Sequence, residues 1–264
     1  MNTILIAMIS VTAIGLICSV LLSVVSKVMA VEVDERMALV RGSLPGANCG
    51  ACGYSGCNGY AAALVEGEAA STLCTPGGNE LVAELSSILG LEAGGNIVKR
   101  AAVVHCFGDN EKKCEKMEYA GIHTCRAAKL HFGGQNACAF GCMGYGDCGE
   151  VCPSGAICIE KGLARIAPMK CTGCGLCVKA CPNFLISIEK DPLMVAVMCK
   201  NTEKGAVLKD KCQVGCIGCM KCVKECQDDA IKVSEALASI DYEKCTGCQK
   251  CVEVCPKGCI VGFG

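Results

Sequence analysis

The chain has 264 residues, a formal net charge of −1 and 28 cysteines, about one residue in nine. Such a cysteine content means either disulfides or metal. Many of these cysteines stand in C-x2-C runs, which make poor disulfide partners, so the composition excludes a disulfide framework and indicates bound metal in a reducing, cytoplasm-facing compartment. Scattered charge, five Phe, five Tyr and no Trp exclude nucleic-acid binding.

The amino-terminal segment, residues 1–26, carries no charged side chain and is dominated by Ile, Leu, Val and Ala. A helix of that length would reach about 39 Å at 1.5 Å per residue, enough for a hydrocarbon layer of about 30 Å. The alternative, a signal peptide, would need a basic segment in front and a shorter apolar stretch. Residues 1–26 are therefore predicted to be a single-pass transmembrane helix in the lipid bilayer of the cell membrane. Because Lys27, Arg36 and Arg41 all follow it, the remainder should be cytoplasmic.

Residues 27–78 are predicted to form a small metal-binding domain. Its cysteines have the spacing x2, x4, x16, namely Cys49, Cys52, Cys57 and Cys74. Glycines between them let the backbone fold tightly over a cluster and present N–H groups to its sulfurs. An Ala-rich helix is expected at residues 58–68. Four thiolates would also suit zinc, but the cysteine runs further along the chain favour a [4Fe–4S] cluster.

Residues 79–135 are predicted to form a linker of mixed helix and strand. Apolar residues share one face of a helix with Asn79 as its N-cap and Gly90 as its stop, namely Leu81, Val82, Leu85, Ile88 and Leu89. A short buried strand should follow at residues 101–104. The linker holds extra cysteines and otherwise shows no catalytic pattern.

Two segments that lie 74 residues apart match without a gap, residues 156–182 and 230–256. Each ends in C-x2-C-x2-C-x3-C-P, the ligand run of bacterial [4Fe–4S] ferredoxins. Before each run a β-hairpin is predicted; the hairpins pair 156–159 with 163–166 and 230–233 with 237–240. The chain is therefore assigned to the α+β class, with two tandem 2[4Fe–4S] ferredoxin-like domains at residues 136–198 and 199–264.

In ferredoxins of this kind the fourth cysteine of each run binds the other cluster. That rule predicts four ligand sets: Cys152, Cys171, Cys174 and Cys177; Cys138, Cys142, Cys148 and Cys181; Cys216, Cys219, Cys222 and Cys255; and Cys226, Cys245, Cys248 and Cys251. The repeat offset matches Cys138 with Cys212 but Tyr145 with Cys219, so either Cys212 or Cys219 could be spare. The standard x2, x2, x3 spacing favours Cys219 as the ligand.

With the amino-terminal set, twenty cysteines form five predicted clusters and eight remain. Cys18 lies in the apolar segment, and Cys158 and Cys259 align with Lys232 and Leu185, which marks packing positions. The others flank the first ferredoxin-like domain on both sides and could supply a sixth cluster: Cys106, Cys114, Cys125, Cys199 and Cys212.

A literal G-x-G-x-x-G occurs at residues 144–149, inside a cysteine run. A dinucleotide site needs this motif between a strand and a helix of a βαβ unit, so no nucleotide is expected. No nucleophile with an adjacent base is apparent either. The chain alone should carry electrons and perform no substrate chemistry.

Two stretches carry a family resemblance, together with the charge-free amino terminus and the ferredoxin runs. They are LPGANCGACGYSGCNGYA at residues 44–61 and YAGIHTCRAAKLHFGGQNACAFGCMGYGDCGEVCP at residues 119–153. In these the chain resembles the RnfB family, the B subunits of Rnf complexes, and looks like its clostridial-type branch. Rnf complexes are membrane-bound, ion-translocating ferredoxin:NAD oxidoreductases.

The resemblance implies that the chain accepts electrons from soluble ferredoxin and relays them through [4Fe–4S] clusters. The recipients would be the other membrane and NAD-binding subunits of the complex, with coupling to ion translocation and NAD reduction. Two alternatives are an electron-wire subunit of another membrane redox complex and a structural adaptor that binds zinc.

Overall fold

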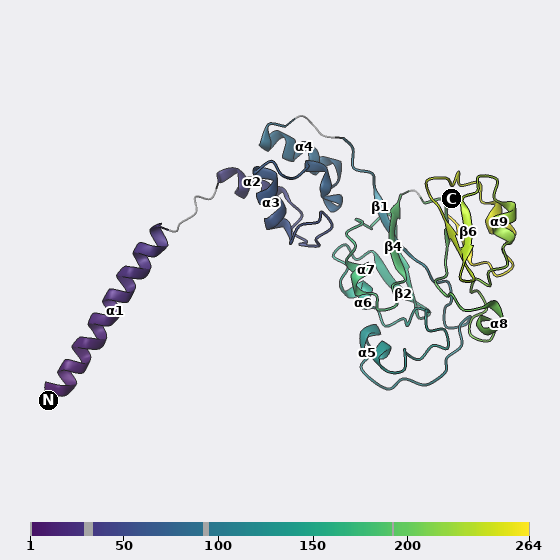
Figure 1. Ribbon diagram of the computed structural model, residues 1–264, viewed down its shortest axis with the longest axis horizontal. Helices are drawn as coiled ribbons and strands as arrows, with labels where there is room; N and C mark the ends of the chain where they lie inside the picture. The colour runs from purple at the N-terminus through teal and green to yellow at the C-terminus, as the bar shows by residue number, and fades with distance from the viewer. Residues whose placement is uncertain (1, 29–33, 92–94, 192, 264) are drawn as a thin grey trace.

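The computed structural model describes residues 2–28, 34–91, 95–191 and 193–263. Its first helix, α1 (Asn2–Val28), stands apart from the rest of the molecule (Figure 1). A membrane span needs about 20 consecutive, predominantly apolar residues. Among the described residues, no helix is both long enough and apolar enough to cross a membrane. The prediction of a transmembrane helix at residues 1–26 is therefore wrong.

An all-helical domain follows α1. It comprises α2 (Glu35–Ser43), α3 (Cys57–Val65), α4 (Gly78–Leu89) and two 3₁₀ turns, η1 (Ser71–Leu73) and η2 (Thr75–Gly77). Its core gathers Val40 of α2, Tyr60 of α3 and Leu85 of α4, each at most 1% exposed. The Tyr60 hydroxyl donates a hydrogen bond to the Ala70 carbonyl oxygen at 2.7 Å and so ties α3 to the chain that returns toward Cys74.

Helix α4 confirms the helix expected after residue 78 but begins differently. Its N-cap is Gly77 rather than Asn79. The Asn79 side chain instead accepts a hydrogen bond from the Ile97 N–H at 2.7 Å, because it already lies inside the first turn and faces the linker. The helix ends as predicted at Gly90, whose φ of +68° is the left-handed conformation that glycine adopts readily.

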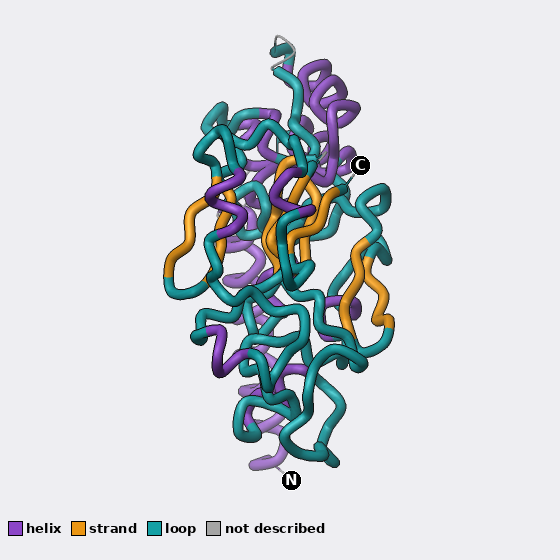
Figure 2. Tube along the Cα trace, turned by 90° about the vertical axis from the view of Figure 1, so that its right-hand side faces the viewer, coloured by secondary structure: helices purple, strands orange, loops and turns teal. Residues whose placement is uncertain are grey.

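Two modules of the same construction make up the remainder (Figure 1). The first contains β1 (Arg100–Val104), α5 (Cys125–Leu130), α6 (Asp147–Glu150), β2 (Ile157–Glu160), β3 (Leu163–Ile166), α7 (Leu176–Ala180) and β4 (Ile186–Lys190). The second contains β5 (Val195–Val197), α8 (Gly205–Leu208), α9 (Lys221–Glu225), β6 (Ile231–Ser234), β7 (Leu237–Ile240), α10 (Lys250–Glu253) and β8 (Ile260–Gly262). Figure 2 shows that loops connect these short strands and helices.

The 74-residue repeat of the sequence is also a repeat of structure. Each of five elements in the first module begins 74 residues before its counterpart in the second: α6 and α9, β2 and β6, β3 and β7, α7 and α10, and β4 and β8. Both predicted hairpins are confirmed, with Ile157 opposite Ile166 in one and Ile231 opposite Ile240 in the other.

Two further sheets join strands that are distant in sequence. The strand expected at residues 101–104 is β1, and it pairs antiparallel with β4, the last strand of its module. In the second module β5 pairs with β8 in the same way. Local pattern could not predict these pairs, because each joins the beginning of a module to its end.

The two modules pack against each other through apolar side chains and one histidine. Val103 of β1 shares a buried cluster with Ala196 and Met198 of the second module. His105 is buried, with Nδ1 2.7 Å from the Val197 carbonyl oxygen and Nε2 2.7 Å from the Ser187 hydroxyl. Burial lowers the pKa of His105, so a neutral ring links β1 to both β4 and β5.

The Tyr60 hydrogen bond gives a test of the amino-terminal core. We expect Tyr60→Phe to lower the free energy of unfolding of this domain by about 1 kcal/mol, because a buried hydroxyl and its carbonyl partner lose their hydrogen bond. Denaturant unfolding of the cluster-loaded chain would measure the loss. Tyr54→Phe is the matched control: Tyr54 lies beside Tyr60, with ring centroids 5.6 Å apart, and an equal loss in both variants would contradict the assignment.

Candidate metal centres

The amino-terminal domain brings its four predicted cysteines together. Burial raises the pKa of the Cys74 thiol, and the nearby Cys49, Cys52 and Cys57 side chains raise it further. The loop that carries them needs glycine at residue 56, which has a φ of +139°. A Cβ there would lie 3.0 Å from Asn48 Oδ1, the atom that accepts the Cys57 N–H at 2.9 Å.

The first module gathers one predicted ligand set intact. Burial raises the pKa of Cys177 to about 11, with added repulsion from Cys174, Cys171 and Cys152. Backbone N–H groups point at two of these sulfurs: the Ala102 N–H donates to Cys171 Sγ and the Ala156 N–H to Cys152 Sγ, each at 3.3 Å. Such N–H···S contacts are what thiolate ligands of an iron–sulfur cluster receive.

The second module repeats that set at the 74-residue offset as Cys226, Cys245, Cys248 and Cys251. Burial raises the pKa of Cys251 to about 11, and Cys245 and Cys248 contribute. Cys226 ends α9, and its N–H donates to the Cys222 carbonyl oxygen at 3.1 Å. The structure thus brings Cys245, Cys248 and Cys251 together, and Cys226 stays the predicted fourth ligand of this set.

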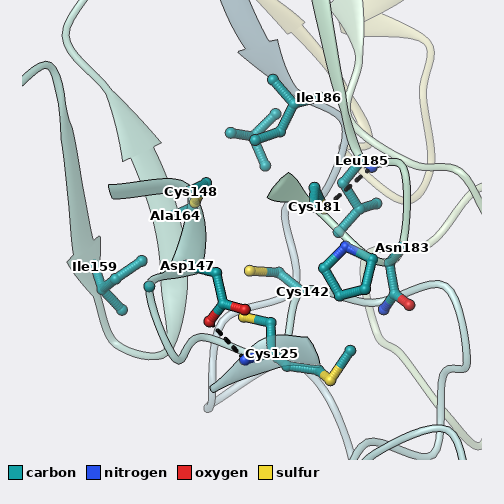
Figure 3. Close-up of a pocket in the computed structure, with 14 residues that line it drawn as sticks. Cys125, Cys142, Asp147, Cys148, Ile159, Ala164, Cys181, Asn183, Leu185 and Ile186 are labelled. Atoms are coloured by element: carbon teal, nitrogen blue, oxygen red, sulfur yellow. Dashed lines mark hydrogen bonds between the residues drawn. The ribbon is translucent and has the colours of Figure 1, made fainter. Parts of the chain in front are cut away.

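The first module's other pocket contains a cysteine that the sequence did not assign to it. Four cysteines line the pocket, namely Cys125, Cys142, Cys148 and Cys181, and Figure 3 shows them around one space. Burial raises the pKa of Cys148 to about 12, and Cys142 and Cys125 add to it. Asp147 holds Cys125 in place, because its Oδ1 accepts the Cys125 N–H at 2.6 Å. Cys138, which the sequence placed here, does not line this pocket.

The equivalent pocket of the second module is lined by all four of its predicted ligands and by a fifth thiol. The ligands are Cys216, Cys219, Cys222 and Cys255. The fifth is Cys259, whose sulfur lies 3.6 Å from Cys255 Sγ. Its thiol lowers the pKa of Cys255 to about 5 by hydrogen bonding. Cys259 thus supports the predicted ligand Cys255. Its alignment with Leu185 had predicted a packing role alone.

A third pocket lies between the two modules. Its cysteines, here called the junction group, are Cys106, Cys138, Cys199 and Cys212. Burial raises the pKa of Cys106 to about 12 and that of Cys199 to about 11. The Asn201 side chain donates to Cys138 Sγ at 3.2 Å.

The junction group contains three of the five cysteines that the sequence offered for a sixth cluster, together with Cys138. The other two separate from it, since Cys125 lines the first module's pocket and Cys114 is exposed. Exposed thiols also occur at Cys18 and Cys158. With Cys259 set apart as the extra thiol of the second module's pocket, the other twenty-four cysteines can be divided into six groups of four.

The junction group follows the internal repeat of the chain. Cys138 and Cys212 occupy equivalent positions 74 residues apart. Cys106 and Cys199 also correspond, because each comes two residues after the strand, β1 or β5, that pairs with its module's last strand. Each module thus contributes the same two cysteines to a site between them.

An inserted segment explains why Cys125 was missed. The segment between Cys106 and Cys138 in the first module is longer than the matching segment between Cys199 and Cys212 in the second. The extra residues contain α5, which begins at Cys125. Where the second module has Cys219, the first has Tyr145. Cys125 packs in one buried cluster with Tyr145 and so supplies a thiol from outside the run.

The donor set fits [4Fe–4S] clusters, since all the proposed ligands are soft thiolates and several receive backbone N–H groups. Within residues 2–28, 34–91, 95–191 and 193–263, no group of three or more His, Cys, Asp or Glu side chains is arranged to hold one metal ion. In a cubane cluster each thiolate binds a different iron, so the four sulfurs need not converge on one point. Bound clusters would supply one-electron redox chemistry.

Comparison with known proteins matches this organisation. Family models match in three places: "Putative Fe-S cluster" at residues 44–76 and two versions of "4Fe-4S dicluster domain" at 170–231 and 206–261. The match at residues 170–231 spans parts of both modules. Family-level similarity thus supports iron–sulfur clusters in the amino-terminal domain and in both modules.

Curated relatives align with nearly the whole chain. The B subunit of the Na(+)-translocating ferredoxin:NAD(+) oxidoreductase complex of Acetobacterium woodii is 44% identical over 94% of this chain and 74% of the relative. The proton-translocating counterpart of Clostridium ljungdahlii is 43% identical over 91% of this chain and 85% of the relative. The B subunit of the ion-translocating oxidoreductase complex of Methanosarcina acetivorans is 39% identical over 92% of this chain and 93% of the relative.

The reassignment of Cys125 can be tested by iron content. We expect the anaerobically purified chain to carry about twenty-four irons, four for each of six clusters. Cys125→Ser should lose about four of them, because a cluster lacking one thiolate is released. Cys114→Ser is the control, since Cys114 is an exposed thiol on the same inserted segment. Equal iron in both variants would return Cys125 to the spare thiols.

Proposed function

This chain belongs to the family of B subunits of ion-translocating ferredoxin:NAD(+) oxidoreductase complexes, and we propose that it carries electrons from reduced ferredoxin through six [4Fe–4S] clusters to other subunits. The clusters would supply the redox chemistry, while the protein holds them, shields them from water and sets their spacing. The observation that carries this proposal is the near-continuous succession of cysteine groups through the chain.

Hydrogen bonds at the junction group support an unbroken route between the modules. The Cys142 N–H donates to Cys106 Sγ at 3.5 Å, which links the junction group to the first module's pocket. The Cys216 N–H donates to Cys199 Sγ at 3.3 Å, which links it to the second module's pocket. Cys142 and Cys216 are equivalent positions of the repeat. The junction cluster would therefore be coupled in the same way to both neighbours.

The amino-terminal group adjoins the first module. Lys179 of α7 donates to the Cys49 carbonyl oxygen at 3.4 Å, and α7 also contains the ligand Cys177. This contact supports electron transfer between the cluster of Cys177 and the cluster of Cys49. The amino-terminal cluster would then be one end of the chain.

At the other end, Cys219 and Cys248 are exposed ligands of the second module. A cluster with an exposed ligand lies close enough to the surface to exchange electrons with a docked protein.

We assign electron entry from soluble ferredoxin to the second module and electron exit to the amino-terminal cluster. The partners would be the membrane and NAD-binding subunits of the complex, at the cell membrane with the cluster domains on the cytoplasmic side. Its electron flow would drive NAD reduction and ion translocation.

Removal of the amino-terminal cluster tests this direction. In the assembled complex, Cys52→Ala should abolish ferredoxin-dependent NAD reduction, because the electrons lose their exit. The module clusters should still be bleached by reduced ferredoxin, since their ligands are separate. Cys158→Ala, which removes an exposed thiol of β2, should leave both readouts unchanged. Full NAD reduction by a Cys52→Ala complex shown to lack that cluster would place the cluster off the route.

A further inference from the structure

Lys113 is a buried lysine with no carboxylate partner. It is 8% exposed, and its Nζ donates to two backbone carbonyl oxygens, those of Cys142 at 2.9 Å and Gly162 at 3.0 Å. None of the ion pairs within the described residues includes Lys113. The neighbouring carboxylate, Asp109, is paired with Lys112 at 2.9 Å instead.

An ammonium in this position requires a negative charge nearby. Burying a charged side chain is unfavourable unless it is paired, and two carbonyl dipoles provide only part of the compensation. Lys113 lines the pocket of the junction group together with Cys106, Cys138 and Cys212. Its backbone also forms a β-bridge with Cys212. A four-thiolate cluster in that pocket has a net negative charge and would be the missing partner.

We propose that Lys113 is the buried counter-charge of the junction cluster and raises its reduction potential, an inference that rests on the proposed sixth cluster. When the cluster accepts one electron its negative charge grows by one, and a fixed ammonium nearby stabilises that reduced form. No proton needs to move. The same ammonium binds the carbonyl of Cys142, a ligand of the adjacent cluster, so its charge acts where the first module meets the junction.

The proposal distinguishes Lys113 from the surface lysines of the same segment. Lys116 also donates to a backbone carbonyl, that of Phe132 at 2.6 Å, but it is exposed. Water and salt screen its charge, whereas a buried charge is screened far less. Lys116→Met is therefore the matched control for Lys113→Met: each removes one lysine bound to a carbonyl, and only one of them is buried.

The test is a redox titration of the cluster-loaded chain followed by electron paramagnetic resonance. In Lys113→Met and Lys113→Gln we expect the midpoint of one cluster to become more negative. At a fixed solution potential, its ratio of reduced to oxidised form should fall about tenfold or more. Lys113→Arg, which keeps the charge, and Lys116→Met should titrate like the unaltered chain. Six intact clusters with unchanged midpoints in Lys113→Met would overturn the proposal.

A second background identifies the cluster concerned. Cys138→Ser should remove about four irons, and in that background Lys113→Met should no longer shift any midpoint potential. A midpoint shift that persists would mean that Lys113 acts on another cluster and would overturn the proposal. If Cys138→Ser keeps all its iron, the sixth cluster itself fails, which is a different result from an intact cluster that ignores Lys113. Should both neutral variants lose about four irons, retention by Lys113→Arg supports the need for the charge, and equal loss in Lys113→Arg contradicts it.

Discussion

The constraint on which the structure depends is the cost of gathering thiolates in a protein interior. Burial together with neighbouring sulfurs raises the pKa of Cys106 and Cys148 to about 12 and that of Cys177 to about 11. Near neutral pH such side chains keep their protons unless iron replaces them, so cluster binding releases protons and stabilises the fold. The modules have cysteines within their cores, and inorganic groups would do there what large apolar side chains do in other proteins.

This constraint also explains how two modules become one conductor. Each module provides two cysteines to the junction group, and each directs one backbone N–H at it, from Cys142 and from Cys216. A site with half its ligands in each module cannot form in either alone. Cluster binding there would hold the modules together, in addition to the contact of Val103 with Ala196 and Met198, and would fix the distance over which electrons pass.

The amino-acid sequence was sufficient to predict the structure where its pattern was local or repeated. The 74-residue offset predicted both hairpins, and the helix ending at Gly90 was confirmed. It could not place Cys125, because this ligand comes from an inserted segment with no counterpart in the repeat. Spacing grouped Cys138 with Cys142, whereas the two line different pockets. The match of Cys138 with Cys212 in the repeat could have indicated the junction group, because a site between two repeats is formed by equivalent positions of both. The predicted transmembrane helix at residues 1–26 was wrong, because no helix among the described residues is both long enough and apolar enough to cross a membrane.

The central claim, a cluster shared by the two modules, is tested most directly by diffraction at the iron absorption edge from crystals of the cluster-loaded chain. Six peaks of anomalous scattering are predicted, one of them between β1 and β5 and bound by Cys106, Cys138, Cys199 and Cys212. Five peaks, with these four cysteines present as free thiols around an iron-free pocket, would contradict the account.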